Sequence, residues 1–128
     1  MKTPYELLGG EEVLRKLVQR FYVVMDTLPE AQPIRKMHPA NLKTSEDKLF
    51  DFLSGWLGGP PLFEQKHGHP RLRARHLPFT IGKSERDQWM ICMVHAFEDI
   101  GIQDPLRSQL LESILRLADH MRNQPETE

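Results

Sequence analysis

Apolar residues recur along this chain at steps of three and four, the spacing that places side chains on one face of a helix. No segment alternates apolar and polar residues long enough to indicate a strand. The clearest stripe, in residues 11–27, consists of Val13, Leu14, Leu17, Val18, Phe21, Tyr22 and Met25. We therefore predict an all-α fold with four or five main helices.

Three further helices have recognisable ends. One is predicted to begin at Thr44 or Ser45 and to stop at the GGPP run of residues 58–61. Another is predicted to begin near Ser84, which an acidic residue follows three positions later in the pattern of a capping box. The last spans residues 105–121.

Composition limits the class of protein. The formal net charge of -1 gives no basic surface for nucleic acid, and one cysteine excludes an internal disulfide framework and fits a reducing compartment. No stretch resembles a signal peptide or a transmembrane span. We expect a cytoplasmic protein with no nucleic-acid or membrane partner. We expect one domain over residues 1–123, a polar tail over 124–128, and a long non-helical stretch over 58–70.

The segment HGHPRLRARHLPF, residues 67–79, contains His67, His69 and His76 together with three arginines. His76 lies where a helix could end, because Pro78 disfavours helical geometry in the residue before it. Its imidazole could face inward toward a metal while the other ring nitrogen is held by a hydrogen bond. Each histidine also has an ordinary interpretation as a loop or helix-end residue. A zinc site formed by all three fits poorly, because their spacing is unusual and no cysteine joins them.

Tyr22 and Trp89 each combine an apolar ring with one hydrogen-bonding end. Both fall on apolar helical faces, where they are either core aromatics bonded to backbone carbonyls or donors aimed at a ligand. An all-α domain can hold a cofactor between its helices, so the second interpretation stays open.

The sequence closely resembles the bacterial group II (O-type) truncated haemoglobins. The resemblance rests on YELLGGEEVLRKLVQRFY at residues 5–22 and on GGPPLFEQKHGHPRLRARHLPFTIGKSERDQWMICM at residues 58–93, and it extends to about Leu117. It implies a truncated globin fold, a two-over-two helical sandwich around haem. No Cys-x-x-Cys-His run is present, so the haem would be haem b, bound without a covalent link.

The resemblance also implies roles for individual residues. His76 matches the proximal histidine that ligates the haem iron, Tyr22 matches the distal tyrosine, and Trp89 matches the distal tryptophan. The further positions that match residues around the porphyrin or its propionates are Ser45, Leu49, Phe52, Leu53, Arg73 and Arg75.

One position departs from the family pattern. His38, in KMHPAN, stands where the family commonly has phenylalanine or tyrosine. We hypothesise that His38 or Tyr22 coordinates the iron as a sixth ligand in the ligand-free protein. The alternative is that His38 stays off the metal and forms hydrogen bonds only to a ligand or water.

The expected distal residues bear on function. Hydrogen bonds from Tyr22, Trp89 and His38 would slow the release of dioxygen, which argues against simple oxygen transport and favours chemistry on the ligand. Nitric oxide oxidation by a dioxygenase reaction, peroxidase-like reduction of peroxide, and oxygen scavenging or sensing without turnover all stay open. Carbon monoxide is a further expected ligand. The chain has no GxGxxG motif, so turnover would need an external electron donor or reductase.

Overall fold

The computed structural model describes residues 2–124, and these residues form helices without strands. The four main helices are α2 (Gly10–Thr27), α4 (Lys43–Trp56), α7 (Lys83–Ile100) and α8 (Leu106–His120). Shorter helices are α1 (Pro4–Leu8), η1 (Pro29–Ala31), α3 (Gln32–Arg35), α5 (Leu62–His67) and α6 (Leu72–His76). The predicted all-α class is confirmed. Of the tail predicted for 124–128, all but Gln124 lies outside the described residues.

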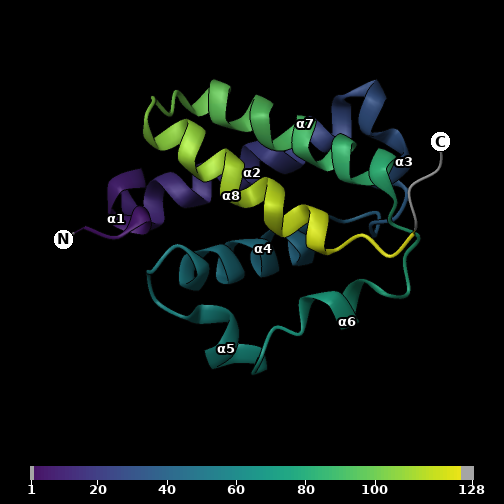
Figure 1. Ribbon diagram of the computed structural model, residues 1–128, viewed down its shortest axis with the longest axis horizontal. Helices are drawn as coiled ribbons and strands as arrows, with labels where there is room; N and C mark the ends of the chain where they lie inside the picture. The colour runs from purple at the N-terminus through teal and green to yellow at the C-terminus, as the bar shows by residue number, and fades with distance from the viewer. Residues whose placement is uncertain (1, 125–128) are drawn as a thin grey trace.

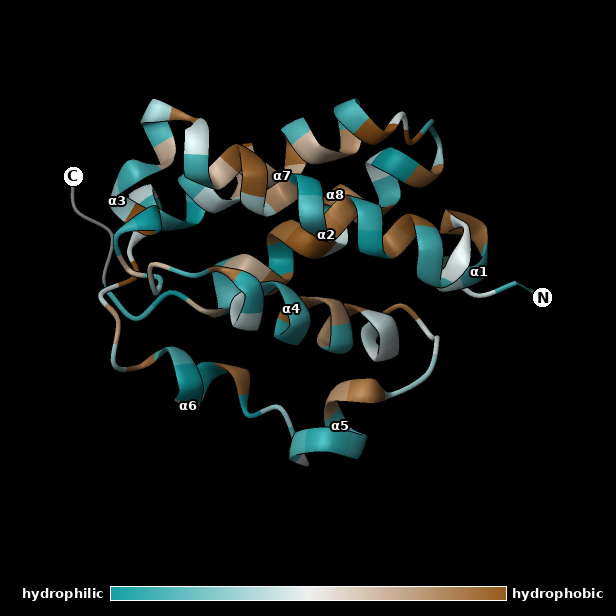
Figure 2. Ribbon diagram, turned by 180° about the vertical axis from the view of Figure 1, so that it is seen from behind, coloured by the Kyte–Doolittle hydropathy of each residue, from teal (hydrophilic) through white to brown (hydrophobic). Residues whose placement is uncertain are grey.

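The main helices pack face to face around one core. α2 lies against both α7 and α4, and α7 also packs against α8 (Figure 1). Hydrophobic and hydrophilic segments alternate along α2 and α4, as helices with one buried face require (Figure 2). The largest fully buried side chains are Phe21, Phe97, Leu14, Leu17, Met25, Leu53, Met93 and Ile114. The apolar stripe predicted for residues 11–27 therefore forms the centre of the core.

Two helices begin earlier than their sequences predict. α4 begins at Lys43, because the side chain of Asn41 accepts a hydrogen bond from the Lys43 backbone N–H at 2.9 Å. α7 begins at Lys83, because the Glu85 carboxylate accepts from the Gly82 N–H at 2.7 Å. The prediction of a cap at Ser84 is therefore wrong. Both helices start on polar contacts that the apolar periodicity does not report.

The prediction that residues 58–70 lack a helix is also wrong, because α5 lies within them. Phe63 is buried on this helix, and Lys66 reaches back to α4, where its Nζ lies 3.0 Å from a carboxylate oxygen of Asp51. Asp51 is almost fully buried, so this ion pair ties α5 to α4. Six residues are too few to display a helical period, which is why the pattern missed this element.

The turn between α4 and α5 depends on a glycine. A Cβ atom on Gly59 would lie 2.6 Å from ring atoms of Tyr5, so the aromatic ring occupies the space that a side chain would need. The Tyr5 N–H also donates to the Leu57 carbonyl at 2.9 Å. The GGPP run therefore brings the start of the chain against the end of α4 as well as terminating that helix.

Substituting Gly59→Ala should lower the free energy of unfolding by about 1 to 3 kcal/mol, because the new methyl group overpacks the contact with Tyr5. Denaturant unfolding of the variant measures this loss. Repeating the substitution in a Tyr5→Ala background should recover most of it. An equal loss in both backgrounds would show that the ring contact is not the cause.

Candidate functional site

His76 is the last residue of α6, and its ring has a defined tautomer. Nδ1 lies 2.5 Å from the Leu72 carbonyl oxygen. A carbonyl can only accept a hydrogen bond, so Nδ1 carries the proton and Nε2 keeps its lone pair. Nε2 has no hydrogen-bond partner within residues 2–124. This is the arrangement of a neutral imidazole prepared to ligate a metal.

The segment that carries His76 is poorly covered by the rest of the protein. No residue of α6 is buried, and Leu77 and Phe79 just beyond it are 59% and 42% exposed. Figure 1 shows α6 set apart from α2 and α7, and its contact with α8 is made by the Arg73 side chain at the end of that helix. The apolar side chains of this segment are therefore available to pack against a bound group.

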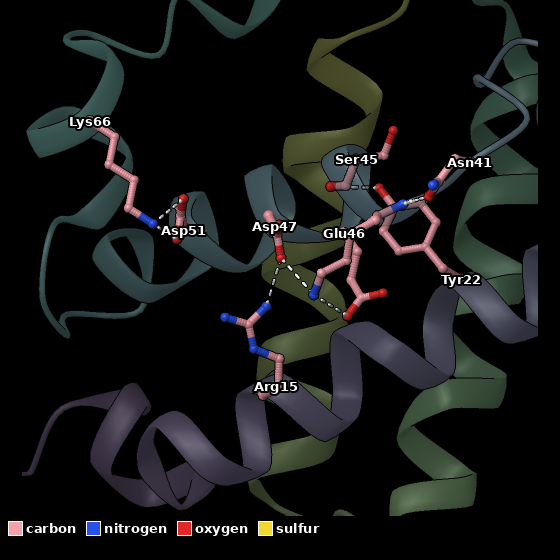
Figure 3. A network of polar contacts seen from close by, with 9 residues as sticks. Arg15, Tyr22, Asn41, Ser45, Glu46, Asp47, Asp51 and Lys66 are labelled. Atoms are coloured by element: carbon pink, nitrogen blue, oxygen red, sulfur yellow. Dashed lines mark hydrogen bonds and ion pairs between the residues drawn. The ribbon is translucent and has the colours of Figure 1, made fainter.

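Tyr22, on α2, is buried among the helices. Its hydroxyl donates to the Ser45 carbonyl of α4 across a long 3.4 Å, and Figure 3 shows the two groups facing each other. Burial raises the pKa of the Tyr22 hydroxyl far above its ordinary value, and the nearby negative charge of Glu46 raises it further. Tyr22 is therefore a neutral phenol with a proton to donate.

One ion pair joins α2 to α4 beside Tyr22, and a second lies within α4. Arg15 on α2 lies 3.2 Å from a carboxylate oxygen of Asp47 on α4, and Lys43 lies 3.1 Å from the same carboxylate (Figure 3). Because these groups are partly exposed, their contribution to stability is small.

His38 follows α3 and lies beside Tyr22, with 5.9 Å between the ring centroids. Its Nδ1 is 2.9 Å from the Ile34 carbonyl oxygen, so Nδ1 carries the proton in the neutral ring. Burial lowers the pKa of His38 against the raising effect of that hydrogen bond, and the charges of Arg35 and His76 lower it too. His38 is thus neutral at pH 7, and His76 lies within electrostatic range of it.

Trp89, on α7, is half-buried against Phe21, with 5.0 Å between the ring centroids. Phe21 also packs edge-to-face on Tyr22 at 4.9 Å. The Trp89 indole N–H donates no hydrogen bond to any of residues 2–124. The phenol of Tyr22 and the indole of Trp89 thus flank one core aromatic ring, and each retains a donor with little or no competition from the protein.

The residues predicted on α4 divide into two groups. Leu49 and Phe52 are half-buried and pack against the edge of the core, so part of each side chain remains open to a ligand. Leu53 is 1% exposed and belongs to the core between helices. Ser45 contributes its backbone carbonyl to Tyr22. The structure thus leaves Leu49 and Phe52 better placed than Leu53 to contact a bound group.

Comparison with known proteins identifies the family. The family model described as bacterial-like globin matches residues 3–123. The chain belongs to this family. The chain is 42% identical over 126 residues to a group 2 truncated haemoglobin of Bacillus subtilis, covering 98% of this chain and 92% of the relative.

Solved structures agree with this assignment. A group II two-on-two haemoglobin from Agrobacterium tumefaciens superposes with a TM-score of 0.93 at 47% identity, over 98% of this chain and 97% of that one. A cold-adapted truncated haemoglobin from Pseudoalteromonas haloplanktis superposes with a TM-score of 0.92 at 51% identity, over 97% of this chain and 100% of that one. The predicted resemblance to group II truncated haemoglobins and the two-over-two globin fold are both confirmed.

Membership of a globin family implies haem and small gaseous ligands, and the side chains of this truncated globin fit such a group. His76 offers a free Nε2, while Leu49 and Phe52 offer half-buried apolar surface. Tyr22 and Trp89 supply hydrogen-bond donors. These are the parts that a haem pocket needs: one axial nitrogen, apolar walls and distal donors.

The two predicted propionate partners already make contacts within this globin. Arg73 donates from Nη1 to the His120 carbonyl at 3.1 Å, where α8 ends. Arg75 donates from Nε to the Pro70 carbonyl at 2.7 Å, and its guanidinium lies 5.1 Å from the Phe63 ring centroid. Both side chains are exposed and each guanidinium has further N–H groups, so a propionate role stays a prediction.

The structure gives no support to the alternative zinc site. Within residues 2–124 there is no cluster of three or more His, Cys, Asp or Glu side chains that could hold a metal ion. His67 and His69 are exposed, and His69 accepts a hydrogen bond from the Arg71 N–H at 3.1 Å.

No helix within residues 2–124 is both long and apolar enough to cross a membrane.

Two features of the site were absent from the sequence predictions. Glu46 lies close enough to Tyr22 to raise its pKa, and Asn123, at the end of the domain, contacts the segment that follows His76. Glu46 directly follows Ser45, a predicted site residue, and this adjacency is a weak indication that Glu46 lies near Tyr22. No sequence pattern indicates the second, because the two partners are 47 residues apart.

Proposed function

We propose that this protein binds haem b non-covalently, with His76 as the proximal ligand, and binds dioxygen and other small diatomic ligands on the side of Tyr22 and Trp89. The observation that carries the proposal is the state of His76. Its Nδ1 is committed to the Leu72 carbonyl, and its Nε2 lone pair is free on a segment with little cover. Haem, when bound, supplies an iron centre that accepts a small ligand and exchanges electrons.

The distal residues of this chain would retain such a ligand. Tyr22 is a protonated phenol whose only hydrogen bond within residues 2–124 is the long one to Ser45, so it can turn its proton toward a negatively polarised ligand. The Trp89 indole N–H has no competing partner there. Each hydrogen bond contributes roughly 0.5 to 1.5 kcal/mol, so two of them slow dissociation by about 5- to 160-fold.

Slow release suits chemistry on the ligand better than oxygen transport. We infer oxidation of nitric oxide or reduction of peroxide, with electrons from an external reductase, because the sequence has no glycine-rich dinucleotide motif. Cys92 is buried and burial raises its thiol pKa to about 11, so it is a poor nucleophile. The single cysteine also suits the cytoplasmic location that we propose. Oxygen scavenging or sensing without turnover is the outcome if no reductase sustains the reaction.

The proposal is tested by absorption spectra of the haem-reconstituted protein in its ferric, dithionite-reduced and carbon-monoxide-bound forms. We expect a strong Soret band that shifts on reduction and again on adding carbon monoxide. Failure to take up haem would contradict the proposal. Low-spin bands before any gas is added would show an internal sixth ligand.

His38 is the residue of this chain best suited to be that ligand. Since its Nδ1–H is held by the Ile34 carbonyl, the neutral ring presents an Nε2 lone pair, which can coordinate or accept but cannot donate a hydrogen bond. This tautomer disfavours the alternative in which His38 donates to a distal ligand.

Substituting His38→Leu should therefore remove most of any low-spin fraction in the ferric and ferrous spectra, while haem stays bound. His95→Leu on α7 is a suitable control, because the His95 side chain is exposed and makes no ring contact with Tyr22 or Trp89. A low-spin fraction that survives His38→Leu would exclude His38 and leave Tyr22→Phe as the next variant to examine.

A further inference from the structure

Asn123, three residues beyond α8, is bonded to the segment between His76 and Ile81. Its side-chain Nδ2 donates to the carbonyl oxygens of His76 at 3.2 Å and Phe79 at 2.7 Å. Its Oδ1 accepts from the Ile81 N–H at 3.0 Å, and its own backbone N–H donates to the Ile81 carbonyl at 2.8 Å. One amide side chain thus satisfies three backbone groups of the connection from α6 to α7.

These bonds matter because little else holds this connection in place. α6 has no buried residue, and Leu77, Pro78, Phe79 and Thr80 are all exposed. The segment therefore lacks the apolar burial that fixes the main helices. Hydrogen bonds to the end of α8 and to the residues that follow it are its principal attachment, and α8 itself is packed, with Leu110 and Ile114 in the core.

A second contact joins the same two elements. Arg73 of α6 donates to the His120 carbonyl at the end of α8 at 3.1 Å. The Asn123 contacts differ from it because one of them is made to His76 itself. The His76 carbonyl accepts from Asn123 and from the Phe79 N–H at 3.0 Å, so both of its lone pairs have a donor.

We propose that Asn123 is a positioning residue for the proximal histidine. By fixing the His76 carbonyl and the turn that follows, it sets the direction in which the His76 Nε2 faces. This inference rests on the proposed haem function of His76. Asn123 would touch neither haem nor ligand and would act only through the backbone of His76.

Two substitutions of Asn123 separate the donor role of its side chain from the acceptor role. Asn123→Ala removes all three of them, whereas Asn123→Asp keeps the acceptor for Ile81 and replaces the donor with a carboxylate that repels the His76 and Phe79 carbonyls. If donation to the His76 carbonyl is what positions the ring, the two variants should change the iron–histidine stretching band and the rate of haem loss in the same way. Gln103→Ala is a matched control, because Gln103 is an exposed amide that donates to a loop carbonyl, Gly101, before α8.

The first measurement is the iron–histidine stretching band of the ferrous protein by resonance Raman spectroscopy, together with the rate of haem transfer to a scavenging protein. Each variant is made in the His38→Leu background, which removes the proposed internal sixth ligand and leaves the ferrous iron five-coordinate. In both Asn123 variants we expect a shifted or broadened band and haem loss faster by about tenfold, the effect of two lost hydrogen bonds. Gln103→Ala should leave the band and the rate unchanged.

The second measurement uses the haem-free protein. Hydrogen exchange should show that Asn123→Ala, but not Asn123→Asp, loses protection at the Ile81 amide, since only the alanine variant lacks the Oδ1 acceptor. Altered exchange with an unchanged iron–histidine band would overturn the positioning role and leave Asn123 a structural residue. If the His38→Leu protein, which lacks the proposed internal sixth ligand, binds haem with no iron–histidine band, the assignment of His76 fails instead, which is a separate result.

Discussion

Replacing His76 with glycine should abolish the ferrous haem spectrum of the unsubstituted protein, and adding imidazole to the buffer should restore it. His76 differs from His69 of the same segment in keeping a free lone pair on Nε2, because the Leu72 carbonyl holds its Nδ1–H. Removing His76 would take away the nitrogen that we propose as the iron ligand, and apolar contacts alone would hold the porphyrin weakly. Absorption spectra with and without imidazole measure both parts of the result.

The control for this substitution is His69→Gly. His69 lies in the same arginine-rich segment and is exposed, and its ring nitrogen is engaged with the Arg71 backbone N–H. Its loss should leave the spectrum intact. A His76→Gly protein that kept a normal ferrous spectrum without imidazole would show that another side chain ligates the iron, and the proposed proximal role would fall.

The parts of the fold that follow from local pattern could be predicted. Each long helix buries one stripe, so the period of three and four residues reveals α2, α4, α7 and α8. α5 could not be found in this way, because it is short and held by a tertiary ion pair, Lys66 with Asp51. The starts of α4 and α7 were misplaced because Asn41 and Glu85 set them through polar contacts.

The candidate site shows the same division between local and tertiary information. The ring types of His76, Tyr22 and Trp89, read with the family resemblance, were enough to nominate them. The state of each ring was not predictable, since it depends on which carbonyl lies nearby: Leu72 for His76 and Ile34 for His38. For His38 this detail bears on the chemistry, because a neutral ring whose Nδ1–H is held by a carbonyl has an Nε2 that can accept or coordinate but cannot donate a hydrogen bond.

Removing the distal donors should have the largest effect on ligand release. Tyr22→Phe and Trp89→Phe each delete one polar group and keep most of the aromatic packing against Phe21. Each should speed dioxygen dissociation by roughly 2- to 13-fold, because one net hydrogen bond contributes about 0.5 to 1.5 kcal/mol. Stopped-flow replacement of dioxygen by carbon monoxide measures the rates.

The double variant distinguishes two arrangements of these donors. If Tyr22 and Trp89 bond the ligand independently, their effects on the dissociation rate multiply; if they compete for one position, the double variant releases ligand little faster than the more affected single variant. Tyr5→Phe and Trp56→Phe are matched controls, because Tyr5 packs on Gly59 and Trp56 is 37% exposed at the end of α4. Equal dissociation rates in all four single variants would mean that neither Tyr22 nor Trp89 bonds the ligand. Slow release of dioxygen would then have to come from the packing of the helices around the ligand.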